Sequence, residues 1–290
     1  MRSWLFVPGD SERKLAKGRA SGADVLILDL EDSVAAERKA AARGLVRDYI
    51  ASEVAQQDRP QLYVRINPLT TEGWQTDLEE VMRVAPDGIM LPKSRSGEDV
   101  QPLALALSHA EQANGRPDGS TRILAIATEV AVSVLNLPSY LDASTRLIGL
   151  TWGAEDLSAE VGASSARDAD GAYTSPFRLA RDLTLFTAVA ARIEPIDTVF
   201  VNFRNANGLA VECAEAARDG FSGKMAIHPD QVDAINRAFR PRDEDIARAR
   251  EIVRLFAENP DAGVIGRAGE MLDRPHLLKA QRLIARAERS

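Results

Sequence analysis

The sequence contains few of the residues that build disulfide scaffolds or zinc centres. Its 290 residues include one cysteine and three histidines. The single cysteine, Cys213, excludes an internal disulfide framework and suits a reducing cytoplasm. His228 and His276 have no histidine or cysteine partner at metal-ligand spacing, which argues against a zinc site. We therefore expect a cytoplasmic protein without structural disulfides or zinc.

Several other features are also missing. No apolar run approaches the roughly 18 residues that span a membrane, and the N-terminus lacks the pattern of a secretory signal. A net charge of −7 argues against nucleic-acid binding, because a phosphate backbone needs a basic surface. Neither a glycine-rich phosphate loop nor a GxSxG nucleophile turn occurs. An anionic small ligand remains possible, since it needs only a local positive pocket.

What the sequence does contain is a series of eight short apolar runs. They are Ser3–Val7, Val25–Leu28, Leu62–Ile66, Gly88–Leu91, Arg122–Ala127, Arg146–Thr151, Thr198–Asn202 and Lys224–Ile227. Their apolar residues are consecutive and not alternating, which is typical of parallel strands buried on both faces. Helical stretches such as Ser11–Ser21 and Ala206–Asp219 separate them, so the chain reads as repeated βα units.

The length of the chain fits one TIM (β/α)8 barrel, a fold of about 250 residues, with a helical extension. We place the barrel at residues 1–257. Residues 258–290 do not continue the repeat and are expected to form a C-terminal tail or lid.

Polar residues at or just after the eight runs indicate where the chemistry lies. The carboxyl ends of parallel strands point to one side, and a β/α barrel has its active site there. The residues are Gly9, Asp29, Glu31, Asp32, Arg65, Lys93, Glu129, Glu155, Asp156, Asn202 and His228. We expect them to converge on one face of the barrel.

Glu129 and Asp156 follow the fifth and sixth runs, which are expected to be neighbouring strands. Magnesium favours oxygen ligands and often takes one or two carboxylates, with water and substrate oxygens completing its shell. The alternative is that both acids only solvate loops or cap helices. Trp152 to Ala154, before Glu155, favours a tight turn under an aromatic wall, so we predict a magnesium site.

Arg65 lies within an apolar strand, where a charge is costly unless it is paired. Its guanidinium can bind a carboxylate through two hydrogen bonds, which suits recognition of a keto acid. An ion pair with Asp29 or Glu31 is the alternative, and the two roles are compatible. Asp29, Glu31 and Asp32 either cap the helix after Ser33 or accept bonds from Arg65 and metal-bound water.

Arg13, Lys14 and Lys17 follow the first strand at helical spacing. They form either a phosphate-binding set of point charges or a solvated helix face.

Six segments, in this order, carry a resemblance to a known family. They are Arg2–Asp10, Leu28–Asp32, Tyr63–Pro68, Gly88–Lys93, Trp152–Leu157 and Gly223–Pro229. With these motifs the chain resembles the citrate lyase β-subunit-like group of the HpcH/HpaI aldolase superfamily. The motifs are specific for the family and not for a substrate, since the group includes lyases for citryl-CoA, malyl-CoA, methylmalyl-CoA and citramalyl-CoA.

The resemblance implies a role for individual residues. Glu129 and Asp156 match the magnesium ligands of the family, and Arg65 matches the arginine that contacts the keto acid. Asp273 looks like the tail aspartate that reaches a neighbouring subunit's site as acid or base, in trimers or hexamers built by tail exchange. The coenzyme A set is implied to be Arg13, Lys14, Lys17, Lys224, His228 and Pro229.

The implied activity is a magnesium-dependent carbon–carbon lyase. It would cleave or condense a short 3-hydroxydicarboxylyl-CoA of the citramalyl, malyl or citryl type, giving an α-keto acid and acetyl-CoA or a homologue. Arg65, Asp273, Asp29 and Glu31 form its expected catalytic set. The alternatives are a citrate lyase component that needs partner subunits, and an aldolase that acts on free hydroxy-keto acids without coenzyme A.

Overall fold

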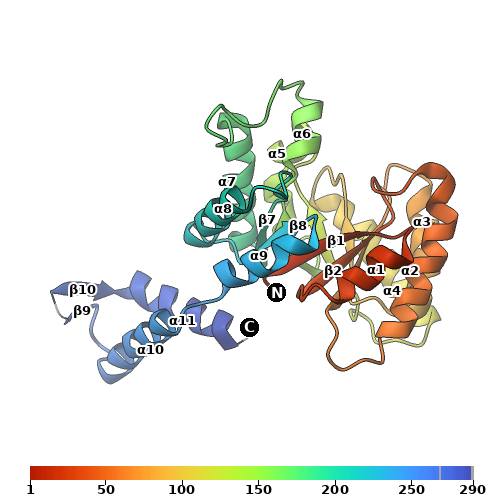
Figure 1. Ribbon diagram of the computed structural model, residues 1–290. Coiled ribbons are helices and arrows are strands. Elements are labelled where there is room, and N and C mark those ends of the chain that lie inside the picture. Colours follow the sequence, from red (N-terminus) through yellow and green to blue (C-terminus); the bar gives the residue numbers. More distant parts are fainter. Residues whose placement is uncertain (268, 289–290) are drawn as a thin grey trace. The chain divides into compact units, whose positions relative to one another are not determined.

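The computed structural model describes residues 1–267 and 269–288, and its larger part is a closed barrel of eight parallel strands (Figure 1). The strands pair in chain order, and β1 pairs with β8 to close the barrel. They are β1 (Ser3–Pro8), β2 (Val25–Asp29), β3 (Gln61–Arg65), β4 (Gly88–Leu91), β5 (Arg122–Ile126), β6 (Leu147–Thr151), β7 (Glu194–Asp197) and β8 (Gly223–Ala226). This confirms the predicted TIM barrel.

Helices connect the strands and cover the barrel from outside (Figure 1). The α-helices of this part are α1 (Glu12–Arg19), α2 (Lys39–Glu53), α3 (Gly73–Val81), α4 (Val100–Ala113), α5 (Ala131–Leu135), α6 (Ala154–Glu160), α7 (Ser175–Ala190), α8 (Ala206–Asp219) and α9 (Val232–Phe239). Short 3₁₀ turns lie at Ala36–Arg38, Met82–Val84, Gly97–Asp99, Leu137–Tyr140 and Pro229–Gln231.

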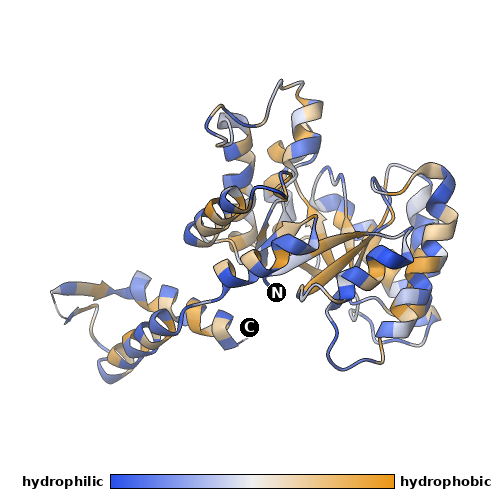
Figure 2. Ribbon diagram, viewed as in Figure 1, coloured by the Kyte–Doolittle hydropathy of each residue, from blue (hydrophilic) through white to orange (hydrophobic). Residues whose placement is uncertain are grey.

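The barrel interior is filled by large apolar side chains. Trp4, Ile27, Tyr63, Met90 and Met225 belong to one buried cluster, and the rings of Trp4 and Tyr63 meet edge to face at 5.1 Å. Most of the strands are correspondingly apolar along most of their length (Figure 2). Such burial is the main favourable contribution to folding, and a filled interior leaves only the mouth of the barrel for chemistry.

Strand β7 differs from the prediction. The sequence analysis placed it at Thr198–Asn202, whereas the strand is Glu194–Asp197. This segment contains Glu194, Pro195 and Asp197. Such residues are depleted in strands, so the sequence does not indicate a strand here. Asp197 is tolerated because Lys224 forms a buried ion pair with it.

Residues 2–238 form one compact unit, and the described residues from 239 to 288, together with Met1, form another. The second unit contains α10 (Asp243–Glu258), the antiparallel hairpin of β9 (Val264–Arg267) and β10 (Glu270–Asp273), and α11 (Arg274–Glu288). Its own small core includes Ile252, Phe256 and Leu272. Helix α10, which was assigned above to the barrel, is thus grouped with the C-terminal residues. Among the described residues, no helix is long and apolar enough to cross a membrane.

Candidate active site

The register of the barrel brings Asp29 and Arg65 together. They are paired residues at the ends of β2 and β3. Ile27 and Tyr63, two positions earlier, point into the barrel. Because side chains alternate along a strand, Asp29 and Arg65 point to the same side. Arg65 donates from Nε to Oδ1 of Asp29 and from Nη2 to Oδ2, each at 2.7 Å. Burial opposes ionisation of Asp29, but the hydrogen bonds and charge of Arg65 outweigh it and hold the pKa of this carboxyl below its usual value.

Arg65 has two further contacts. Its guanidinium lies 4.8 Å from the ring centre of Phe6, and its Nη1 is 3.0 Å from Oε2 of Glu31. The arginine is therefore fixed in place by the protein. The alternative of an ion pair with Asp29 or Glu31 is correct for both acids, and it is compatible with a role in substrate binding.

Lys93 contacts acidic residues from both sides of the site, although the sequence analysis assigned it no role. These are Glu31 and Asp32 after β2, and Glu129 and Asp156 after β5 and β6. The backbone of Lys93 is in the left-handed region, with φ of 48°, and its amide donates to Oε2 of Glu129 at 2.5 Å. Its ammonium binds the carboxylates of Glu31 and Asp32 and lies 3.5 Å from Asp156. These neighbours raise the pKa of Lys93, although burial opposes this. Its place just after β4 was the only signal in the sequence.

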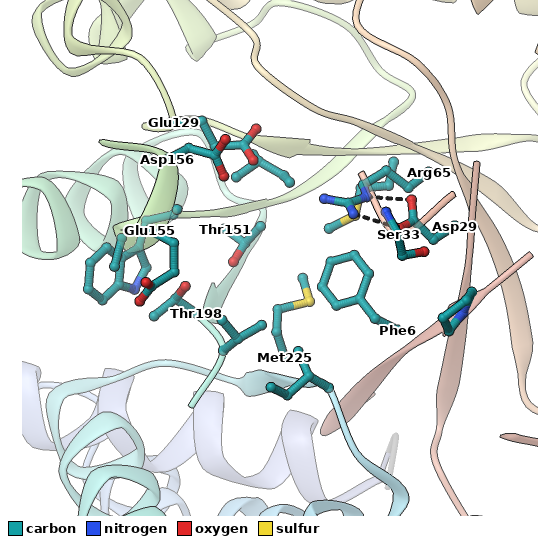
Figure 3. A pocket seen from close by; sticks show the side chains of 18 residues that line it. Phe6, Asp29, Ser33, Arg65, Glu129, Thr151, Glu155, Asp156, Thr198 and Met225 are labelled. Atoms are coloured by element: carbon teal, nitrogen blue, oxygen red, sulfur yellow. Dashed lines mark hydrogen bonds and ion pairs between the residues drawn. The ribbon is translucent and has the colours of Figure 1, made fainter. Parts of the chain in front are cut away.

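Glu129 and Asp156 face the same cavity (Figure 3). Glu129 is 3% exposed, and burial, with a contribution from the charge of Asp156, raises its pKa to about 8. Asp156 lies in the first turn of α6. Gly153 permits this approach, because a Cβ there would lie 2.5 Å from Cγ of Glu129.

The cavity has a volume of about 280 Å³. In Figure 3 the two acids lie on one side and the Arg65–Asp29 pair on the other. Most of the remaining lining is apolar and includes Phe6, Met90, Ile126, Trp152, Val199 and Met225. The hydroxyl of Thr151 also lines the cavity, and it is buried without a hydrogen-bond partner within the described part of the chain.

These residues fit a magnesium ion. Glu129 and Asp156 would supply hard oxygen ligands, and a dication would offset the burial and the neighbouring negative charges that disfavour ionisation of Glu129. Residues 1–267 and 269–288 offer no cluster of three or more His, Cys, Asp or Glu side chains arranged for a metal. Water and substrate oxygens would then complete the shell, as is usual for magnesium.

The residues expected to bind coenzyme A lie in different parts of the barrel unit and differ in exposure. Arg13, Lys14 and Lys17 are exposed on α1, which follows the carboxyl end of β1. His228 is half-buried, and its ring stacks on Phe203 at 4.8 Å.

Pro229 begins the 3₁₀ turn that His228 caps. Beside this turn lies a second cavity, which is lined by His228 and by Arg204 and Arg237.

Lys224 does not fit the predicted coenzyme-binding role. Its side chain is 0% exposed, and its Nζ lies 2.6 Å from Asp197 and 2.7 Å from Glu212. Because neighbouring Met225 points into the barrel, Lys224 points outward beneath α8. A fully buried ammonium with two carboxylate partners has no surface for a phosphate, so we remove Lys224 from this set.

Asp273, the expected proton carrier, belongs to the second unit at the end of β10. Its Oδ1 is hydrogen-bonded to Nδ1 of His276 at 2.5 Å. This bond holds the pKa of the carboxyl below its usual value.

With this geometry in place, comparison with known proteins decides the family. The model of the HpcH/HpaI aldolase/citrate lyase family matches residues 2–229. The chain belongs to this family. It is 34% identical to the citrate lyase subunit beta of Leuconostoc mesenteroides, with 98% of this chain and 92% of that protein aligned.

Two further family members are informative. The mitochondrial citramalyl-CoA lyase of Homo sapiens is 32% identical over 99% of this chain and 85% of its own length. The crystal structure of CitE from Mycobacterium tuberculosis, in complex with magnesium, acetoacetate and coenzyme A, superposes with a TM-score of 0.78. It shares 35% identity and covers 99% of this chain and 98% of its own.

Proposed function

We propose that this chain is a magnesium-dependent lyase that cleaves, or forms, the carbon–carbon bond of a short 3-hydroxydicarboxylyl-CoA thioester. The observation that carries the proposal is one cavity lined by Glu129, Asp156 and Arg65. These groups provide for a divalent cation and for an anionic substrate. The family relationship supports it, because a CitE relative has been solved with magnesium, acetoacetate and coenzyme A.

Each residue has a distinct part in this reaction. Glu129 and Asp156 would hold magnesium, which supplies Lewis acidity to the hydroxyl and carboxylate oxygens of the substrate. Arg65 is fixed by Asp29 and Glu31, so its positive charge is already oriented when negative charge develops on the enolate or the keto acid. The apolar cavity wall excludes water from the reacting atoms.

We further infer that the keto acid is a small monocarboxylate such as pyruvate or glyoxylate. Arg65 is the only cationic side chain among the residues that line the described cavity, and it already binds two carboxylates. A second substrate carboxylate, as in oxaloacetate, would meet no second cation in this lining, but apolar side chains and hydroxyl groups such as that of Thr151, so its charge would be poorly compensated. A methyl group or hydrogen fits there, so the thioester is of the citramalyl or malyl type.

Release of keto acid from a panel of thioesters tests both proposals. Citramalyl-CoA, malyl-CoA and citryl-CoA are incubated with the purified chain and magnesium, and pyruvate, glyoxylate and oxaloacetate are measured. We expect release from the first two substrates, with loss of activity when EDTA is added. Preference for citryl-CoA would contradict the keto-acid assignment, and equal activity in EDTA would contradict the metal.

Partner dependence is the second candidate, because several relatives are named as β-subunits of citrate lyase. In that case the purified chain is inactive on every thioester and gains activity only with partner subunits. Turnover by the chain alone excludes this candidate.

We propose that Asp273 donates a proton to the enolate carbon, or removes one in the condensation direction, at the site of a neighbouring chain in a homotrimer or homohexamer. Asp273→Ala and Asp156→Asn are each expected to be inactive. When the two variants are dissociated and reassembled together, some sites contain both intact residues, so activity returns. No recovery in mixed oligomers would contradict a shared site.

A further inference from the structure

A closed ring of side chains lies behind the wall of the cavity, and no step described so far uses it. It runs through Trp152, Asp197, Lys224, Glu212, Arg167 and Tyr173, and each member contacts the next. Five different segments of the barrel unit contribute to it. The ring therefore joins regions that are distant in the sequence.

Asp197 is the central acceptor of this ring. It is 1% exposed and accepts a hydrogen bond from Nε1 of Trp152 at 2.8 Å. Its second oxygen accepts from Lys224 at 2.6 Å. Because Asp197 ends β7 and Lys224 lies in β8, the sheet itself fixes the position of the carboxylate.

Tyr173 lies on the other side of this closed ring of side chains. Glu212, on α8, receives hydrogen bonds from Lys224 and Arg167, each at 2.7 Å. The guanidinium of Arg167 lies 3.7 Å from the ring centre of Tyr173, which is a favourable cation–π geometry. Tyr173 in turn packs edge-on against Trp152 at 4.8 Å between ring centres.

Trp152 connects this ring to the proposed metal site. The indole lines the cavity, and it is followed by Gly153 and by the first turn of α6, which carries Asp156. The backbone at Gly153 is packed closely against Glu129, because a Cβ built there would lie 2.5 Å from Cγ of Glu129. A rotation of the indole would therefore displace the backbone that separates the two carboxylates.

We propose that Asp197 is a positioning residue: by holding the indole of Trp152 it sets the distance between Asp156 and Glu129 and so the affinity for the divalent cation. The inference rests on the proposed magnesium site. A purely structural ion pair would affect the stability of the barrel and leave metal affinity unchanged.

The test is calorimetric titration of magnesium chloride into the full-length chain and its variants, at a temperature where circular dichroism shows each variant folded. Trp152→Phe removes the indole donor and keeps an aromatic wall, whereas Asp197→Asn removes the charge. We expect each to weaken magnesium binding about tenfold, at the lower end of the range for residues that orient metal ligands. The double variant should be no weaker than either single one, because both changes weaken the same contact: one removes the donor and the other removes the charge of the acceptor.

Glu111→Gln is the matched control. Glu111 is also a fully buried carboxylate in an ion pair, with Arg146, but its other partners, Gly119 and Thr121, precede β5 at the opposite end of the barrel. It should lower the denaturation midpoint and change magnesium affinity less than twofold. If Asp197→Asn fails to fold, Trp152→Phe alone decides the question.

Unchanged magnesium affinity in Trp152→Phe and Asp197→Asn, with binding abolished by Asp156→Asn, would overturn the positioning role and leave the proposed function intact. Magnesium binding that survives Asp156→Asn would instead overturn the metal site, and the inference with it.

Discussion

The barrel contains two clusters of charged side chains that differ in their balance. Behind the sheet, the cations Lys224, Arg167 and Arg181 bind the carboxylates of Asp197, Glu212 and Asp219. At the mouth, the cations Arg65 and Lys93 are outnumbered by Asp29, Glu31, Asp32, Glu129 and Asp156.

The difference indicates what each cluster is for. A buried charge is tolerated when it has partners of opposite sign, so the cluster behind the sheet is complete without any ligand. The cluster at the mouth has an excess of carboxylates beside an open cavity, and burial there raises the pKa of Glu129 to about 8. An added dication would restore the balance.

Removing one carboxylate of the proposed metal pair should have the largest effect on function. Asp156→Asn keeps the shape of the side chain but loses a charged ligand, and we expect kcat to fall about 10³-fold, since Lewis-acid stabilisation amounts to several kcal/mol. Steady-state kinetics with saturating magnesium measures it. Glu79→Gln, on an exposed face of α3, is the control and should retain activity. Full activity of Asp156→Asn would remove Asp156 from the site.

Breaking the balanced cluster should instead reduce stability. Lys224→Met leaves the buried Asp197 and the partly buried Glu212 without their shared cation, and loss of one partner of a buried pair costs about 3–5 kcal/mol. Urea denaturation of the two proteins measures the difference. Lys93→Met, at a side chain that is 28% exposed, should cost less. If the order of the two variants is reversed, the assignment of the clusters is wrong.

Crowding Glu129 should lower the affinity of the proposed site for magnesium without changing any charge. Gly153→Ala places a Cβ 2.5 Å from Cγ of Glu129, so this ligand has to shift, and we expect magnesium affinity to fall about 10- to 100-fold. Gly44→Ala is the control, because the added methyl in α2 has no neighbour within 4 Å and alanine favours the helix. Titration calorimetry compares the two. Equal affinities would show that the contact with Glu129 does not matter.

The smallest effect is expected at the exposed residues of α1. Replacing Arg13 and Lys17 by glutamine removes two solvated charges, and we expect the KM of the thioester to rise about threefold, because exposed charges are weakly coupled and screened by salt. The increase should diminish as sodium chloride is raised. A KM that does not change at low salt would make these residues a solvated face only.

The sequence predicted most of the barrel because apolar runs that are buried on both faces are easy to recognise. It missed β7, whose acidic residue is neutralised by Lys224 from a neighbouring strand. Lys224 was assigned to coenzyme A from the family resemblance, and its pairing with Asp197 across β7 and β8 shows instead that it is buried. Neither fact is visible without knowing which strands are neighbours.

The site shows the same division. Arg65, Asp29 and Glu129 were found because charged residues at the ends of apolar strands are conspicuous. Lys93 has the same position, but its importance depends on a left-handed backbone that directs its amide to Glu129. Local sequence does not predict that conformation for a lysine, because it is uncommon outside glycine.

The most direct test of the account is titration of magnesium chloride into the chain and into Glu129→Gln, followed by calorimetry. Our account predicts one site per chain in the unmodified protein and no measurable binding in the variant, because the excess of carboxylates at the barrel mouth is what attracts the ion. Identical isotherms for the two proteins would contradict it.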